Sequence, residues 1–173
     1  MRIIGIDPGL RKTGWGIIEA NGDEIRQIAN GICETRASDN LAFRLKTIFE
    51  KLTKVVDLHS PEEAAVENTF VNKDATNTLK LGQARGICMV VPAIAGLVVK
   101  EYAPNAVKKA VVGIGHATKD QIEYMINLQF PNIKLTGVDA TDALAVAICH
   151  ASHVRYSMQM QSKLMSVSKA NDW

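Results

Sequence analysis

The sequence predicts an α/β domain in which a mixed β-sheet is flanked by helices. Short runs of β-branched residues separated by turn residues open the chain, and apolar residues at helical spacing then alternate with further short runs. Strands followed by alternating helices and strands are typical of a mixed sheet with helices on its faces. A length of 173 residues suffices for one well-buried domain and is short for two.

The first elements predict an antiparallel meander. Strand-like runs occupy residues 2–7, 13–19 and 24–34, and only short segments separate them. Asn21-Gly22-Asp23 supplies the turn between the second and third runs. These three strands are therefore expected to be neighbours in the sheet.

A helix and a short strand follow the meander. Residues 41–56 carry apolar side chains at helical spacing, so an amphipathic helix is expected to end near Leu58, ahead of Pro61. Residues 63–67 then form a short strand-like run that ends on Glu67.

The middle of the chain predicts two helices around one more strand. The first helix covers about residues 74–95, and Pro92 should kink it because the ring clashes with the carbonyl of Cys88. A strand is expected at residues 97–102. Pro at a first helical position then predicts a helix at residues 104–112.

The last predicted elements are two helices and a tail. Thr118 and Gln121 match a capping box, which predicts a helix from this point. Asp139 and Asp142 open the final helix. Farther on, the sequence turns polar, and such chain ends tend to fray. The expected organisation is a folded domain at residues 1–155 and a frayed or disordered tail at residues 156–173.

Composition limits the classes of function. A net charge of +2 is too small to indicate a nucleic-acid partner without charge clustering. Cys33, Cys88 and Cys149 lack a Cys-x-x-Cys pattern, so they are interpreted as reduced, mostly buried residues rather than zinc ligands. With no signal peptide and no apolar stretch of membrane-spanning length, a cytoplasmic protein without a membrane partner is expected.

Asp139 and Asp142 are the most informative residues of the chain. They are three residues apart, so they share one helical face, and the surrounding residues 138–148 are mostly alanine or aliphatic. Helix capping could account for one of them. A pair of carboxylates on a nearly apolar face also indicates a metal site, because Mg²⁺ and Mn²⁺ prefer oxygen ligands.

Two further acids stand where predicted strands end. Asp7 ends the first strand, directly before Pro8 and Gly9, and Glu67 ends the strand at residues 63–67. Taken alone, Glu67 could be an ordinary exposed glutamate. Together, three separate segments deliver carboxylates to element ends where a pocket could form, which favours the metal site.

A set of short motifs resembles the RuvC family of Holliday-junction resolvases over about residues 2–155. Each motif is weak alone, but they occur in order at matching separations. They are Gly5-Ile6-Asp7-Pro8-Gly9 with Thr13-Gly14, Glu67-Asn68-Thr69-Phe70, Leu79-Lys80-Leu81-Gly82-Gln83-Ala84-Arg85-Gly86, Val112-Gly113-Ile114-Gly115 and Asp139-Ala140-Thr141-Asp142-Ala143. Trp15 and Pro92 depart from the pattern that we expect of the family.

The resemblance implies a ribonuclease H-like fold and a homodimer that nicks two strands of a four-way DNA junction symmetrically. It also implies a branch-migration complex of the RuvA and RuvB type as a partner. By motif position, the catalytic and metal-binding acids are Asp7, Glu67, Asp139 and Asp142. Phosphodiester hydrolysis needs an in-line water and charge relief on the phosphate and leaving oxygen, which two Mg²⁺ ions about 4 Å apart supply. Mn²⁺ is expected to substitute.

The DNA contacts are predicted from charge and from the same resemblance. Lys108 and Lys119 match functional lysines of the family, and with Lys109 they bracket a glycine-containing loop that could grip phosphates. A solvated helix face is the alternative for Lys109. Phe70 could stack on an unpaired base or pack in the core. Surface roles are as plausible as DNA contacts for the remaining candidates, Lys73, Lys80, Arg85 and His116.

The helix at residues 74–95 is the expected dimer interface. Gly82 and Gly86 share one small-residue face, and further apolar residues extend it. Those residues are Ile87, Val90, Val91 and Ile94. The alternative is that this helix packs only inside its own monomer.

Other functions remain open on the residues alone. A nuclease of the same fold could act on RNA or an RNA·DNA hybrid, because four acids do not choose a substrate. A non-catalytic junction-binding module is a second possibility. A fragment of an actin-like ATPase is the third, because the motif around Asp7 also resembles the phosphate loop of those proteins.

Overall fold

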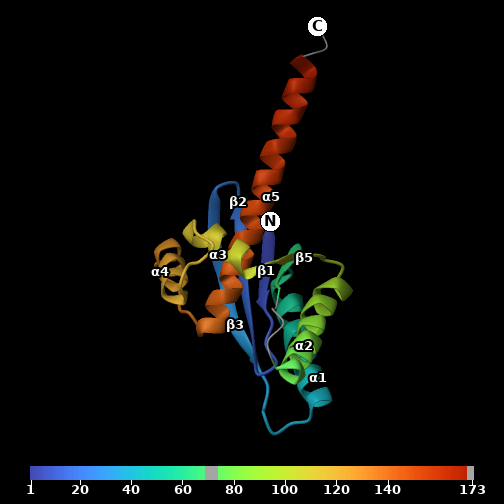
Figure 1. The fold of residues 1–173 in the computed structure, drawn as a ribbon. Helices are drawn as coiled ribbons and strands as arrows, with labels where there is room; N and C mark the ends of the chain where they lie inside the picture. The colour runs from blue at the N-terminus through green and yellow to red at the C-terminus, as the bar shows by residue number, and fades with distance from the viewer. Residues whose placement is uncertain (69–73, 171–173) are drawn as a thin grey trace.

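The computed structural model describes residues 1–68 and 74–170. The elements follow in the order β1 (Arg2–Asp7), β2 (Lys12–Asn21), β3 (Glu24–Glu34), α1 (Leu41–His59), β4 (Glu63–Glu67), α2 (Ala75–Ile94), β5 (Val98–Tyr102), α3 (Pro104–Val112), α4 (Lys119–Gln129) and α5 (Val138–Ala170). Figure 1 shows the sheet at the centre, with α1 and α2 on one side and α3, α4 and α5 on the other.

The described strands form one mixed five-stranded sheet in the order β3-β2-β1-β4-β5. β1, β2 and β3 pair antiparallel, which confirms the predicted meander, and β4 and β5 add in parallel. Parallel neighbours need a crossover, and helices α1 and α2 supply it on the same face. The predicted α/β class is therefore confirmed.

Alternating side chains of the central strands fill two core layers. Ile3 of β1 packs with α3, α4 and α5, whereas Ile4 and Ile6 pack with α1 and α2. These isoleucines are fully buried. Burial on both faces explains why β1 is almost continuously apolar up to Asp7.

The helix boundaries agree closely with the sequence prediction. Thr118 caps α4, and Gln121 closes the predicted capping box. Pro92 lies in the last turn of α2, which ends at Ile94, so few helical residues follow the missing hydrogen bond. Trp15 packs over Gly31, where an added Cβ would come within 2.5 Å of the indole.

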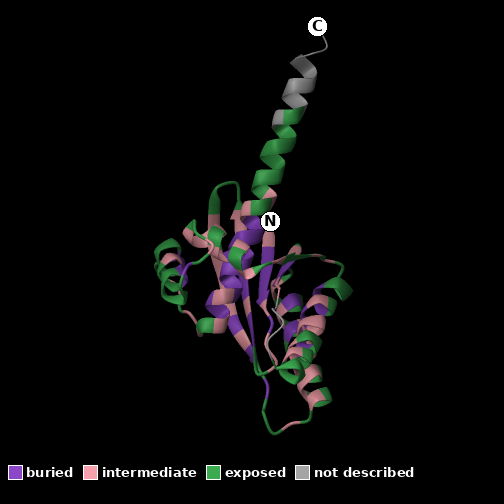
Figure 2. Cartoon of the chain, in the orientation of Figure 1, coloured by how far each residue is buried: buried purple, intermediate pink, exposed green. Residues whose placement is uncertain are grey.

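The long helix α5 has a buried part and an exposed part, as Figure 2 shows. Side chains from Ala143 to Ala151 are buried, whereas Tyr156, Met160 and Leu164 are exposed. α5 thus continues as a helix to Ala170, through residues expected to fray. An isolated helical end without packing is marginal in water, so the tail at residues 156–173 and the boundary at residue 155 stay predictions. Among the described helices, none combines the length and apolarity needed to cross a membrane.

The cysteines are free and buried, as predicted. Burial raises the pKa of Cys33 to about 11 and of Cys88 to about 12. These thiols are therefore protonated and unreactive near neutral pH.

Candidate active site

The candidate site begins at the shared end of two parallel strands. β1 and β4 pair in register from Ile3 opposite Glu63 to Ile6 opposite Val66. Because parallel strands run in the same direction, their next residues, Asp7 and Glu67, emerge at the same end of the sheet. The acids that end these two strands in sequence therefore meet in space.

Glycines of β1 and β2 let the start of α5 approach the sheet. A Cβ added at Gly14 would lie 1.9 Å from the backbone oxygen of Asp139, and one at Gly5 would lie 2.1 Å from that of Ala143. Such distances leave no room for any side chain. Since Gly14 pairs with Asp7 across the ladder, this close packing brings Asp139 and Asp142 to the Asp7 end of β1.

The electrostatics show that these carboxylates converge. Burial, followed by repulsion from Glu67, Asp142 and Asp139, raises the pKa of Asp7 to about 8. The protonated Asp7 carboxyl donates a hydrogen bond to Glu67. Burial is also the largest cause that raises the pKa of Glu67 and of Asp142. Neighbouring acids add to both shifts, so the cluster carries more negative charge than the site compensates.

Two lysines share the cavity with the acids. The cavity has a volume of about 240 Å³ and is lined by Asp7, Glu67, Pro104, Val107, Lys108, Lys119, Ile122, Asp142 and Ala145. Lys119 Nζ lies 3.5 Å from Asp142 Oδ2. Both lysines lower the pKa of Glu67 against the larger effects of burial and repulsion. The cavity therefore has an acidic floor with cations at its rim, as a phosphodiester site requires.

The donor chemistry of this cluster fits a divalent cation. Carboxylate oxygens are the ligands that Mg²⁺ and Mn²⁺ prefer, and a cation would relieve the repulsion around Asp7. Within residues 1–68 and 74–170, however, no three His, Cys, Asp or Glu side chains stand in a ready-made metal-ligand arrangement. The proton shared by Asp7 and Glu67 and the bond from Lys119 to Asp142 occupy these oxygens instead. Cation binding would therefore displace a proton.

The other predicted DNA contacts lie outside this cavity. Lys80 and His116 are exposed, and Lys109 borders a separate groove formed with Ala106, Ser152 and Tyr156. Arg85 instead bonds to Asn68 and Glu101. Phe70 and Lys73 lie outside the described residues, so their predicted roles stay predictions.

Sequence reasoning missed a buried hydrogen-bonded histidine. The ring nitrogens of His150 contact Glu63 Oε2 at 2.5 Å and the Tyr102 hydroxyl at 2.8 Å. Burial lowers the pKa of His150 even though Glu63 opposes the shift, so the ring is neutral near pH 7. This network joins α5 to β4 and β5 at the end of the sheet opposite the acids. The chain offers no local signal for it, because its members lie far apart in sequence.

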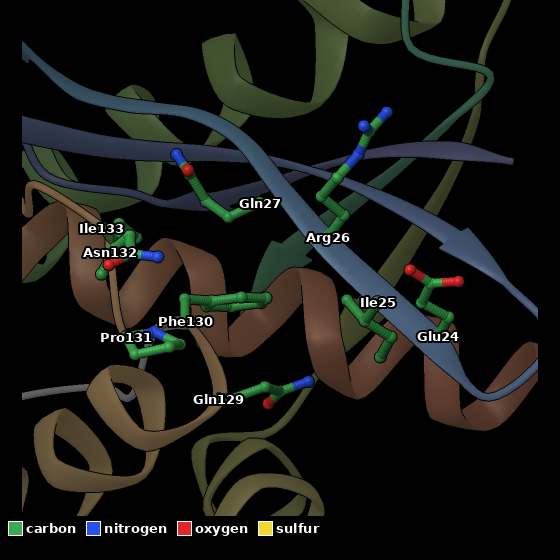
Figure 3. A pocket seen from close by; sticks show the side chains of 9 residues that line it. All are labelled: Glu24, Ile25, Arg26, Gln27, Gln129, Phe130, Pro131, Asn132 and Ile133. Carbon is green, nitrogen blue, oxygen red and sulfur yellow. The ribbon is translucent and has the colours of Figure 1, made fainter.

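A larger cavity lies at the other edge of the sheet and lacks an acid cluster. Figure 3 shows its lining between the start of β3 and the segment after α4. Its volume is about 370 Å³, and Glu24 and Arg26 are its charged residues. An open cavity with one acid offers no counterpart to the carboxylates around Asp7.

Comparisons with known proteins agree on one family. The sequence profile described as "Crossover junction endodeoxyribonuclease RuvC" matches residues 3–150. A protein of that name from Cereibacter sphaeroides is 56% identical over 169 residues, covering 98% of this chain and 100% of the relative. Its namesake from Allorhizobium ampelinum is 58% identical over 164 residues, covering 95% of this chain and 96% of the relative.

A solved structure described as "T. thermophilus RuvC in complex with Holliday junction substrate" superimposes on this chain. Its TM-score is 0.84 at 30% identity, and the match covers 91% of this chain and 96% of that chain. The yeast mitochondrial Holliday junction resolvase Ydc2 has a TM-score of 0.66 at 10% identity over 92% of this chain and 80% of its own, which shows a shared fold.

Proposed function

The chain belongs to the RuvC family of crossover junction endodeoxyribonucleases, and from this premise we propose how its own residues resolve a DNA junction. It is a Holliday-junction resolvase of recombination and repair, a hydrolase with the ribonuclease H-like fold of that family. The observation that carries the proposed mechanism is the convergence of Asp7, Glu67, Asp139 and Asp142, reflected in the raised pKa of Asp7.

Asp7, Glu67, Asp139 and Asp142 would hold two Mg²⁺ ions, with Mn²⁺ as a substitute, and Asp7 would lie between them. When bound, the ions neutralise charge on the phosphate and on the leaving oxygen and lower the pKa of water. The carboxylates must first release the proton shared by Asp7 and Glu67. The buried floor of the cavity orients these oxygens and limits the access of bulk water.

Lys108 and Lys119 would hold the scissile phosphate at the rim of the cavity. Both line it together with Asp7 and Glu67. Lys119 would exchange its contact with Asp142 for a phosphate oxygen when DNA and cations enter. A lysine acts here as a compact positive charge that can follow the phosphate into position.

One cleavage assay tests the mechanism and the substrate together. Labelled four-way junction, linear duplex and RNA·DNA hybrid are incubated with the protein in Mg²⁺ or in chelator. Paired, symmetric nicks in the junction alone, and only with Mg²⁺, are expected. Cleavage of the hybrid alone would overturn the proposal, as would cleavage that persists in chelator.

Lys108→Ala and Lys119→Ala should each slow junction cleavage and flatten its salt dependence. Each change removes a cation that displaces counterions from DNA, worth about 0.9 in the slope of log affinity against log salt for one phosphate. Filter binding and single-turnover cleavage at several salt concentrations measure both effects. Lys54→Ala, at an exposed lysine of α1, is the matched control. An unchanged slope in both cavity variants would contradict the phosphate contact.

We also propose a homodimer that uses one face of α2. Two cuts related by symmetry require two sites at a fixed separation, which a two-fold dimer supplies. A Cβ added at Gly82 or Gly86 would meet no described atom within 4 Å. Leu79, Val90 and Ile94 are exposed on the same helix. The expected interface is wrong at one residue, because Val91 is buried in the core of the monomer, against α1 and the sheet.

Gly86→Leu should produce a folded monomer that has lost paired nicking. The site has space within the described monomer, so the larger side chain is expected to obstruct only a partner. Light scattering measures the mass, circular dichroism the fold and a cruciform assay the pairing of nicks. Asn127→Leu adds the same side chain to exposed α4 as a control. A Gly86→Leu protein that stays dimeric would rule out this interface.

The remaining expectations concern partners and location. A branch-migration complex of the RuvA and RuvB type and a cytoplasmic location stay predictions, in keeping with a family that acts on DNA junctions. The alternatives of an RNA nuclease, a non-catalytic module and an ATPase fragment lack support in the comparisons. The relatives are named as endodeoxyribonucleases and match this chain over nearly their whole length.

A further inference from the structure

Arg85 links α2 to two neighbouring strands beside the acid cluster. Its Nη2 donates to Asn68 Oδ1 over 2.7 Å and also to the carboxylate of Glu101 on β5. The side chains of Arg85 and Glu101 are 25% and 32% exposed, so water screens this ion pair only in part. A charged hydrogen bond in such a setting restrains both of its ends.

Asn68 is the residue through which this restraint reaches the site. It directly follows Glu67, and its backbone N–H donates to the carbonyl of Tyr102 over 2.8 Å. Its backbone is therefore held by β5 while its side chain is held by Arg85 of α2. With both contacts made, the chain leaves β4 in one direction, which sets where the Glu67 carboxylate points.

The charge balance argues against a role for Arg85 in gripping DNA. Glu101 neutralises the guanidinium, and phosphate would have to compete with a bonded carboxylate. The described residues that line the acid cavity include Lys108 and Lys119 but not Arg85. A phosphate contact would also release Asn68 beside Glu67 at the moment of reaction.

We propose that Arg85, held in place by Glu101, is a positioning residue for the cleavage reaction, acting through Asn68 on the orientation of Glu67. The inference rests on the proposed function to the extent that Glu67 is one of the cation-holding acids. It assigns to Arg85 an effect on the chemical step and on cation affinity, and none on DNA affinity.

The test compares Arg85→Met, Arg85→Lys and Glu101→Gln with Lys80→Met, which removes an exposed charge from the same helix. Single-turnover cleavage of a saturated four-way junction should fall by about ten- to a hundredfold in Arg85→Met, since small misplacements have such effects. Glu101→Gln should also slow cleavage, even though removal of an acid favours DNA binding. Arg85→Lys should recover part of the rate. Lys80→Met should cleave as the wild type does.

Two binding measurements separate positioning from other roles. Junction affinity and its salt slope, measured in chelator, should stay within about twofold in Arg85→Met and Glu101→Gln. The Mg²⁺ concentration that half-maximally raises the melting temperature should increase several-fold in both, whereas general destabilisation would lower the melting temperature at every Mg²⁺ concentration alike. If Arg85→Met fails to fold, the milder Glu101→Gln decides by the same measurements.

Three results would overturn the inference. They are weaker binding with a reduced salt slope and an unchanged saturated rate, a Glu101→Gln protein that cleaves at least as fast as the wild type, and an unchanged Mg²⁺ midpoint. Failure of the proposed function is distinguishable, because the wild type itself would then show no Mg²⁺-dependent junction cleavage.

Discussion

Asp7→Asn is expected to reduce junction cleavage on the order of 10⁴-fold, the scale seen when a central catalytic group is removed. An amide keeps the shape of the side chain but lacks the charge with which Asp7 would lie between two cations. Junction affinity should be retained, because basic residues at the rim carry phosphate binding. Gel-shift and single-turnover assays on the same preparation measure both quantities. Near wild-type cleavage, or loss of junction affinity, would count against the assignment.

The same substitution should stabilise the metal-free protein at alkaline pH. The pKa of Asp7 is about 8 in the folded chain against a model value of 3.8, so the folded state binds more protons in between. Stability should therefore rise as pH falls from about 8 toward about 4, because protonation removes a buried, repelled charge. Glu67 and Asp142 have raised pKa values and add to this trend.

Asp7→Asn removes the largest part of that pH dependence. At pH 8 in chelator its melting temperature should exceed that of the wild type by about 5 °C, given about 2–4 °C per kcal/mol for a chain of this length. The gain should shrink as pH approaches 5. Melting curves from pH 5 to 9 check this, with Asp57→Asn on exposed α1 as the control. A melting temperature that falls on substitution at pH 8 would contradict the crowding of charges.

Gly14→Ala should damage both the fold and the site. The added Cβ would lie 1.9 Å from the Asp139 carbonyl oxygen and 2.3 Å from its carbon, and backbone atoms cannot rotate away. The start of α5 must therefore move away from β2, at a cost of about 1–3 kcal/mol or more for an overpacked core. Thermal melting should show a loss of about 5–10 °C.

Cleavage by Gly14→Ala should fall about a hundredfold, since α5 carries two of the proposed acids and small misplacements are costly. Gly115→Ala is the control for stability, because its Cβ would meet Asn105 at 3.4 and 3.7 Å, an ordinary contact distance. If Gly14→Ala kept both its melting temperature and its rate, the close approach of α5 would not be what brings the acids together.

The sequence by itself determined the elements and the acids. Periods of two and of 3.6 residues, the capping box of Thr118 and the turn at Asn21-Gly22-Asp23 all act over a few positions. Their outcome survives packing, so the strand and helix ranges agree with the structure. Asp7 and Glu67 could be paired in advance, because residues that end parallel strands share one end of the sheet.

Only the tertiary structure decided which side chains meet across elements. Arg85 has the sequence of a surface DNA contact but reaches Asn68 and Glu101, 17 and 16 positions away. Val91 joins the core while Val90 on the same helix stays exposed. The physical reason is that local patterns set the conformation of each segment, whereas the rotation and distance of one element against another depend on how all side chains pack at once. The space left at Gly14, which brings α5 to Asp7, is of this second kind.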